Sequence, residues 1–155
     1  MSDFVFNISK GRIGEFYNRV ENSDPTNAAF VLVPLETTGL ESDATLKDYD
    51  TLALLLAAAN NEQATMGRKV LTDADLAAVP SPDDANDRYD FDLPDVTWTG
   101  ATGNAISKML VCYDADTTGG TDANIVPCTA HDFVTTPDGS DIMAQIAAAG
   151  FFRAS

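Results

Sequence analysis

The organisation of the chain is clearest in ISKMLVCYDADTTGGTDANIVPCTAHDFVT, from Ile106 to Thr135. Apolar runs at Ile106–Tyr113, Ile125–Thr129 and Phe133–Thr135 are separated by turn-forming residues, of which Asp114–Asn124 is the longest group. Short apolar and β-branched runs that alternate with turns rich in Asp, Gly and Asn are typical of antiparallel strands joined by hairpins. We therefore predict an antiparallel sheet in this part of the chain.

The segments on either side extend the predicted sheet. In DVTWT, residues 95–99, polar and apolar residues alternate, which places Val96 and Trp98 on the core side of a strand. Further short strands are predicted at Tyr89–Leu93 and Ile142–Ile146. The turns between them are predicted at Gly100–Asn104 and Thr136–Asp141, and a polar, proline-containing connection at residues 80–87 precedes the whole group.

The first half of the chain begins with a predicted helix and a strand. Four apolar residues recur at the spacing i, i+3, i+4 and i+7, which is one face of a helix: Ile13, Phe16, Tyr17 and Val20. We predict that this helix covers residues 10–22 and that Ser9 is its N-cap. The run Phe30–Val33 predicts an interior strand, and a loop follows at residues 36–43.

A second helix is predicted after this loop. Its apolar positions run from Leu46 to Ala59, with Asp43 as the cap before them and Asn60 at the end. The fold class that results is α+β, with two helices of the N-terminal half packed on a mostly antiparallel sheet or sandwich. We predict one domain over residues 1–155, in which residues 1–79 form the half with helices and residues 88–155 form the antiparallel β half.

Composition limits the classes of partner. The 155 residues include 9 Lys and Arg against 24 Asp and Glu, a formal net charge of −15. Such a charge repels phosphate backbones and anionic lipids, so we expect no nucleic-acid partner and no membrane partner. The longest apolar run, Leu52–Ala59, is too short to span a bilayer, and the first residues lack the pattern of a secretory signal. These features predict a soluble protein made in a cytoplasm.

Metal and disulfide chemistry receive little support. Cys112 and Cys128 are the only cysteines, and without a CxxC pair or a second histidine we predict no zinc site. The two thiols are either buried and free or joined between neighbouring strands. The loop that begins DADTTG at Asp114 matches the first half of a calcium-binding EF-hand loop, but Ile125 occupies the position of the essential Glu. We interpret the loop as a turn, with no metal and no cofactor.

The catalytic inventory is equally small. His131 is the only histidine, and Asp132 follows it. Adjacent residues of a strand point to opposite faces, so these two side chains do not form a catalytic pair. No nucleophile stands in a Gly-x-Ser-x-Gly turn. We predict a structural or surface role for His131, no catalytic residues and no enzymatic activity.

Several short motifs follow one another through most of the chain. They include KGRIGEFYNRV (10–20), LKDYDTL (46–52), DVTW (95–98), LVCYD (110–114), IVP (125–127), HDF (131–133), TPDGSD (136–141) and GFF (150–152). In this order the chain resembles a group of small acidic virion structural proteins of tailed bacteriophages, particularly those of actinobacterial hosts. The resemblance implies a capsid decoration or minor head protein, without a catalytic or metal site.

This resemblance, together with the charge, leads to an expected location and partner. An acidic protein is badly placed beside packaged DNA, so we expect it on the outer surface of the head after synthesis in the host cytoplasm. The expected partners are the major capsid protein and further copies of the chain. Two alternatives stay open: a tail or head–tail connector protein, and a host-surface (carbohydrate) binding module. The core-facing position predicted for Trp98 argues against the second of these.

The candidate interface lies at the two ends of the chain. Residues 1–20 carry a net charge near zero and basic residues beside large aromatics, and another aromatic pair lies close to residue 155. Aromatics at chain ends must dock on a subunit or return to the chain's own core. We expect that loss of residues 1–8 abolishes attachment and leaves the domain folded. The candidate capsid or subunit contacts are Phe4, Phe6, Lys10, Arg12, Arg19, Phe151 and Phe152.

Overall fold

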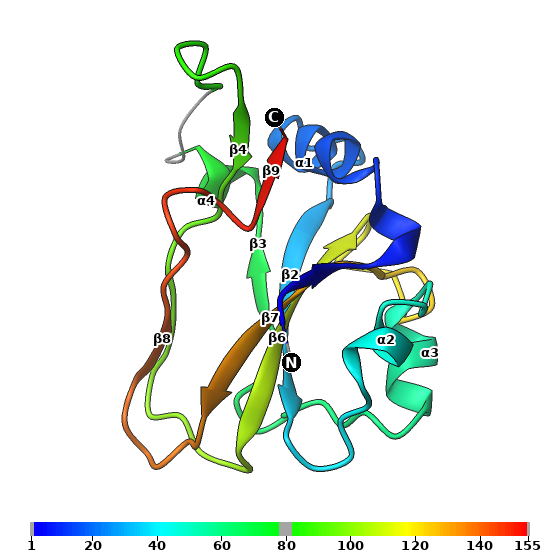
Figure 1. Cartoon of the computed structure of the whole chain (residues 1–155), viewed down its shortest axis with the longest axis vertical. Coiled ribbons are helices and arrows are strands. Elements are labelled where there is room, and N and C mark those ends of the chain that lie inside the picture. The colour runs from blue at the N-terminus through cyan, green and yellow to red at the C-terminus, as the bar shows by residue number, and fades with distance from the viewer. Residues whose placement is uncertain (1, 78–81, 155) are drawn as a thin grey trace.

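A computed structural model describes residues 2–77 and 82–154, and its centre is one antiparallel five-stranded sheet (Figure 1). The strand order is β1-β7-β6-β2-β3. These strands are β1 (Phe4–Val5), β2 (Ala29–Glu36), β3 (Lys69–Leu71), β6 (Ile106–Asp114) and β7 (Val126–Thr135). The predicted interior strand is therefore confirmed as β2, which lies between β6 and β3.

Two small strand pairs lie beside this sheet. The pair β4 (Tyr89–Phe91) and β9 (Phe152–Ala154) lies next to α1, and β5 (Val96–Trp98) pairs with β8 (Ile142–Ala144) (Figure 1). Trp98 is buried, as its alternating pattern predicts, and its Nε1 donates a hydrogen bond of 2.9 Å to the carbonyl of Gly67. The C-terminal strands thus help to close the core over one face of the large sheet.

The first helix, α1 (Ile13–Glu21), buries the predicted apolar face. The predicted N-cap is wrong. Ser9 ends a short 3-10 helix, η1 (Asn7–Ser9), and its hydroxyl donates to the carbonyl of Pro127 at 2.7 Å. This buried contact ties η1 to β7 and leaves Arg12 to precede α1 without a capping side chain.

The predicted second helix is two helices, α2 (Asp43–Leu46) and α3 (Leu52–Ala57). Each has its own cap: Ser42 accepts a hydrogen bond from Thr45 N, and Thr51 accepts one from Leu54 N. Because Thr51 is extended and starts a new helix, the chain cannot continue as one helix through it. Asp43 is the first residue of α2 and not its cap.

Other elements also depart from the prediction. The strands expected at Ile125–Thr129 and Phe133–Thr135 are one strand, β7, with register shifts where it pairs with β6. The strands β1 and β3 and the helix α4 (Asp73–Leu76) are additional, whereas β9 is the strand by which the C-terminal aromatics return to the chain's own core. Residues 80–81 of the expected connection lie outside the described residues. None of the helices in the described ranges is long and apolar enough to cross a membrane.

The sheet carries an apolar cluster on each face. One cluster contains Phe30, Leu32 and Val111 and is covered by α1 and the C-terminal strands. The other contains Val31 and Leu110 and is covered by α2, α3 and the segment that follows β1. Alternate residues of β2 therefore enter opposite cores, and the chain is one α+β domain with a mostly antiparallel sheet between two covering layers.

Candidate functional site

The two N-terminal aromatics have different environments. Phe4 lies on β1 opposite Ala130 of β7 and is half-buried, whereas Phe6 is completely buried in the second core cluster. The Phe4 and Phe6 rings are 5.2 Å apart, and Phe6 N donates to the carbonyl of Cys128 at 3.0 Å. Phe6 is therefore not available to a partner. Loss of residues 1–8 would also remove a core side chain, so this segment is not dispensable for the fold.

The basic side chains divide into paired and unpaired groups. Five of the nine form ion pairs with carboxylates: Arg19, Arg68, Arg88, Lys108 and Arg153. Among the described residues, the other four have no carboxylate oxygen within 4.0 Å of their nitrogens: Lys10, Arg12, Lys47 and Lys69. In a chain of net charge −15, these four cations are the ones free to attract an acidic partner.

Two of the unpaired cations gather around the first strand. Lys47 Nζ lies 5.9 Å from the centre of the Phe4 ring, and the Lys47 carbonyl accepts a hydrogen bond of 2.9 Å from Asn7 N. Lys10 Nζ donates to Asn7 Oδ1 at 2.7 Å, and Asn7 Nδ2 donates to Asp48 Oδ1 at 2.5 Å, so one carboxylate lies beside the two lysines. We refer to Phe4, Asn7, Lys10 and Lys47 as the N-terminal basic surface. Arg12 follows close in the chain, with its guanidinium 4.8 Å from the ring centre of Phe16.

The remaining candidate contacts do not join this surface. Arg19 pairs with Glu15 at 2.8 Å on the exposed side of α1. Phe151 is buried with its ring 5.4 Å from that of Phe30, and the Phe152 ring on β9 lies 5.8 Å from Phe91. The C-terminal aromatics therefore pack on the chain's own core, which is one of the two explanations considered from the sequence.

A buried lysine lies directly below β1. The Lys108 side chain has no exposed surface, and its Nζ lies 2.6 Å from Asp132 Oδ1 and 3.1 Å from Asp43 Oδ1. Nζ also donates to the Ser2 carbonyl at 3.1 Å and lies 5.2 Å from the centre of the Phe4 ring. The cluster was not predicted from the sequence, although the position of Lys108 inside the apolar run of β6 was a usable signal.

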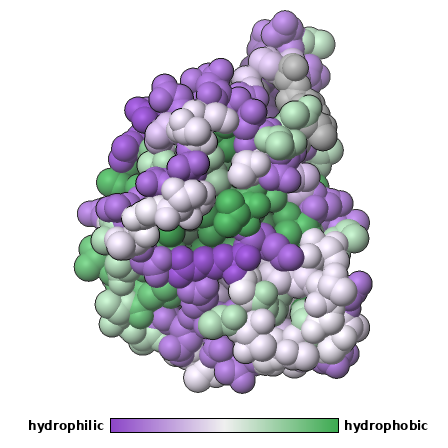
Figure 2. Space-filling view, turned by 180° about the vertical axis from the view of Figure 1, so that it is seen from behind, coloured by the Kyte–Doolittle hydropathy of each residue, from purple (hydrophilic) through white to green (hydrophobic). Residues whose placement is uncertain are grey.

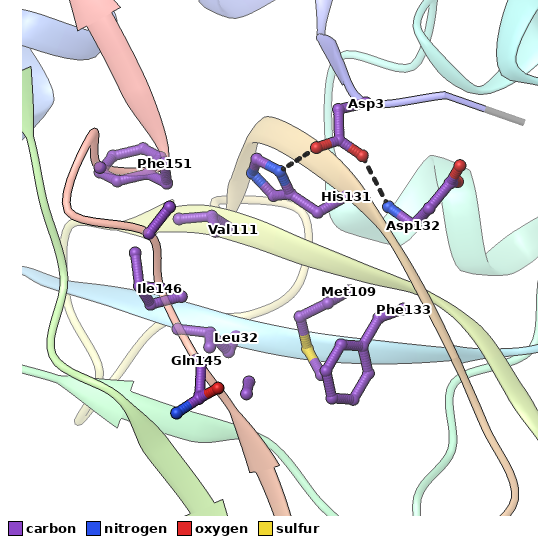
Figure 3. Close-up of a pocket in the computed structure, with 13 residues that line it drawn as sticks. Asp3, Leu32, Met109, Val111, His131, Asp132, Phe133, Gln145, Ile146 and Phe151 are labelled. Atoms are coloured by element: carbon purple, nitrogen blue, oxygen red, sulfur yellow. Dashed lines mark hydrogen bonds and ion pairs between the residues drawn. The ribbon is translucent and has the colours of Figure 1, made fainter.

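A cavity of about 370 Å³ lies between the sheet and the C-terminal segment (Figure 3). Its lining is mostly apolar and includes Met109, Phe133 and Ile146. The pair formed by Asp3 and His131 lies at one end of it (Figure 3). A cavity of this kind can accept an apolar group, with the Asp3–His131 pair at one end and the amide of Gln145 elsewhere in its lining (Figure 3).

His131 has partners on both ring nitrogens. Nδ1 lies 3.1 Å from Asp3 Oδ2 and Nε2 lies 2.9 Å from Thr129 Oγ1, whereas the neighbouring Asp132 turns to Lys108 on the other side of the sheet. Burial of Asp3 alone would raise its pKa, but hydrogen bonds from Asp132 N and His131 lower it. An acid, an imidazole and a hydroxyl thus lie in a row. Thr129 is only 1% exposed and does not line the cavity, so this row offers no accessible nucleophile.

The side chains of the half EF-hand motif form turn contacts. Asp114 Oδ1 accepts from Asp116 N at 3.0 Å, and Asp116 Oδ1 accepts from Thr118 N at 3.1 Å. Asp122 pairs with Arg68 at 2.6 Å. Within residues 2–77 and 82–154, no three metal-ligating side chains come together. The carboxylates therefore serve the backbone of the loop and an ion pair.

The two cysteines are free thiols and are buried in different cores. Cys112 belongs to the cluster beneath α2 and α3, and Cys128 to the cluster beneath α1. Burial raises the pKa of both thiols, that of Cys128 to about 12. Their sulfur atoms therefore serve as small apolar groups on opposite faces of the sheet.

A shallow groove of about 230 Å³ marks another face, formed around Arg68 between β3 and the loop after β6. Arg68 pairs there with Glu62 and Asp122, each at 2.6 Å. The guanidinium in this groove is therefore neutralised by carboxylates of the chain itself.

Figure 2 shows the side of the molecule turned away in Figure 1, with an apolar area in its middle bordered by a band of hydrophilic side chains.

Comparison of the chain with protein families, with curated proteins and with solved structures finds no match.

Proposed function

We propose that this protein is a non-enzymatic structural component of a bacteriophage virion, a capsid decoration or minor capsid protein that binds the outer surface of the head as a homo-oligomer. The observation that carries the proposal is the N-terminal basic surface. In a chain of net charge −15, it combines Lys10 and Lys47, which form no ion pair among the described residues, with the half-buried aromatic Phe4. A cationic rim beside an aromatic anchor fits an acidic protein surface that has an apolar pocket.

The distribution of charge supports the outer side of the shell. The chain from Met109 to Phe152 contains six Asp and no Lys or Arg, so this part of the molecule repels packaged DNA. The sequence resemblance to small acidic virion proteins supports the same location.

The attachment site differs from the one expected from the sequence. Phe4 takes the role assigned to both N-terminal aromatics, because Phe6 is buried. Lys47 joins Lys10 as a contact, and Phe151 and Phe152 stay within the chain. The surface is small, but a protein that binds a shell as an oligomer gains adhesion from several weak contacts at once.

A charge-reversal experiment tests this surface. The double variant Lys10→Glu and Lys47→Glu changes only half-buried or exposed side chains that pair with no carboxylate within residues 2–77 and 82–154, so the fold should be retained. The control is Lys69→Glu, which reverses the fourth unpaired cation on β3, at the opposite edge of the sheet from β1. Each protein is mixed with head shells that lack it, and bound protein is measured after sedimentation.

We expect the double variant to bind at least about tenfold more weakly, and the control to bind like the native chain. Added salt should weaken native binding, because the attraction between exposed charges is screened. Full occupancy by the double variant would rule out attachment through the N-terminal basic surface. Failure of the native protein to bind shells at all would rule out the decoration function.

A further inference from the structure

Lys108 and Asp132 form a short hydrogen-bonded ion pair between two neighbouring strands. They are direct cross-strand partners in β6 and β7, and Lys108 Nζ lies 2.6 Å from Asp132 Oδ1. The Lys108 side chain is completely buried, whereas 36% of the Asp132 side chain is exposed. The Lys108 amine is therefore shielded from water, whereas the Asp132 carboxyl group is partly exposed to solvent.

A second carboxylate stands at the same amine. Asp43 Oδ1 lies 3.1 Å from Lys108 Nζ, yet it is buried without a hydrogen bond of good geometry among the described residues. Asp43 Oδ2 is fixed by a hydrogen bond of 2.7 Å from Ser2 N. Although burial alone would raise the pKa of Asp43, the hydrogen bond from Ser2 N and the contact with Lys108 lower it, so the carboxylate starts without a proton.

We propose that Lys108 and Asp132 join in an intramolecular isopeptide bond, with Asp43 as the proton carrier. Asp43 takes a proton from the ammonium, and the neutral Nζ attacks Cγ of Asp132. The Nζ–Cγ bond forms, and the bond from Cγ to one carboxyl oxygen breaks. That oxygen leaves as water with two protons that came from Nζ through Asp43, which ends as a carboxylate again. No oxidant, metal or cofactor is needed.

Three features favour this reaction over a permanent ion pair. One carboxylate is enough to neutralise one ammonium, and the second is placed where a proton carrier is needed. The Phe4 ring, 5.2 Å from Nζ, closes the amine side against water. The register of β6 and β7 keeps Lys108 and Asp132 opposite each other, so the entropy cost of bringing the two reacting groups together is met by folding. The bond would lock β6 to β7 beneath the N-terminal strand, and it does not depend on the proposed function.

The intact mass of the unfolded native chain tests the proposal. We expect a mass about 18 Da below the value for the sequence, because one water is lost. After proteolysis, a branched peptide should join Lys108 to Asp132. A native chain of full mass, or a branched peptide that joins Lys108 to Asp43, would overturn the assignment.

Two variants test the roles of the carboxyl groups. Asp132→Asn should still form the amide, but with loss of ammonia, so its mass should be lower by about 17 Da. Asp43→Asn keeps the size of the side chain and removes the proton carrier, so it should retain its full mass. Loss of water in Asp43→Asn would refute the role of Asp43. Emission from the buried Trp98 reports whether each variant is folded, and the native mass decides the main claim even where a variant is not.

Discussion

The variant Phe6→Ala tests whether the N-terminal segment is part of the core. The Phe6 side chain has no exposed surface and belongs to the second core cluster, together with Val31 of β2 and Leu110 of β6. Replacement of a buried phenylalanine by alanine costs about 3–5 kcal/mol, from lost burial and the cavity left behind. Because domains of this size are stable by about 5–15 kcal/mol, the variant should fold but lose a large part of its free energy of unfolding.

Equilibrium unfolding in urea measures this loss, with Trp98 emission as the signal. A loss of about 4 kcal/mol and a slope of about 2 kcal/mol per molar urea lower the midpoint by about 2 M. The matched control is Phe4→Ala, which removes a half-buried ring from the same segment and should shift the midpoint less than half as far. Equal shifts for the two variants, or a shift below about 0.5 M for Phe6→Ala, would show that Phe6 is not buried in the folded protein.

Three further predictions concern the thiols, the acid response and the turn after β6. Cys112 and Cys128 should not react with a thiol reagent in the native protein and should both react after unfolding, because burial raises both pKa values; fewer than two thiols after unfolding would indicate a disulfide. The hydrogen bond from Arg68 holds the pKa of Asp122 below 3.8 in the folded protein. The ionised Asp122 therefore contributes to stability above pH 3.8, and this contribution is lost as the pH falls through the lower, folded-state pKa. The variant Asp122→Asn should flatten this acid dependence of the free energy of unfolding. Calcium chelation should leave the melting temperature unchanged, because Asp116 bonds to its own turn, and a fall of more than about 10 °C would reveal a bound cation.

The features that the sequence predicts well are those set by neighbours along the chain. The buried face of α1, the strand β2 and the inward position of Trp98 all follow from local spacing of apolar residues. The strands β1 and β3 were missed, although β5 and β8 are equally short and were predicted, because Phe4–Val5 and Lys69–Leu71 show no alternation of polar and apolar residues. Each of the two gains its hydrogen bonds from a partner far away in the sequence. Local patterns cannot identify such partners.

The candidate site was predicted only in part for the same reason. Lys10 was chosen from its position near the N-terminus, but Lys47 joins it through a contact with Phe4 that spans most of the first third of the chain. Phe6 resembles Phe4 in the sequence, and only the pairing of β1 with β7 decides which ring enters the core. The apolar residues on both sides of Lys108 were a signal that this lysine is buried. In the structure all the residues of β6 are buried.

The number of copies of this chain in purified virions tests the central proposal most directly. Quantitative mass spectrometry against the major capsid protein gives that number. A decoration protein of the head predicts copies on the order of hundreds per particle, in a fixed ratio to the shell subunits. A ring of about six or twelve copies would indicate a connector or tail protein, and the absence of the chain from virions would contradict the proposed function.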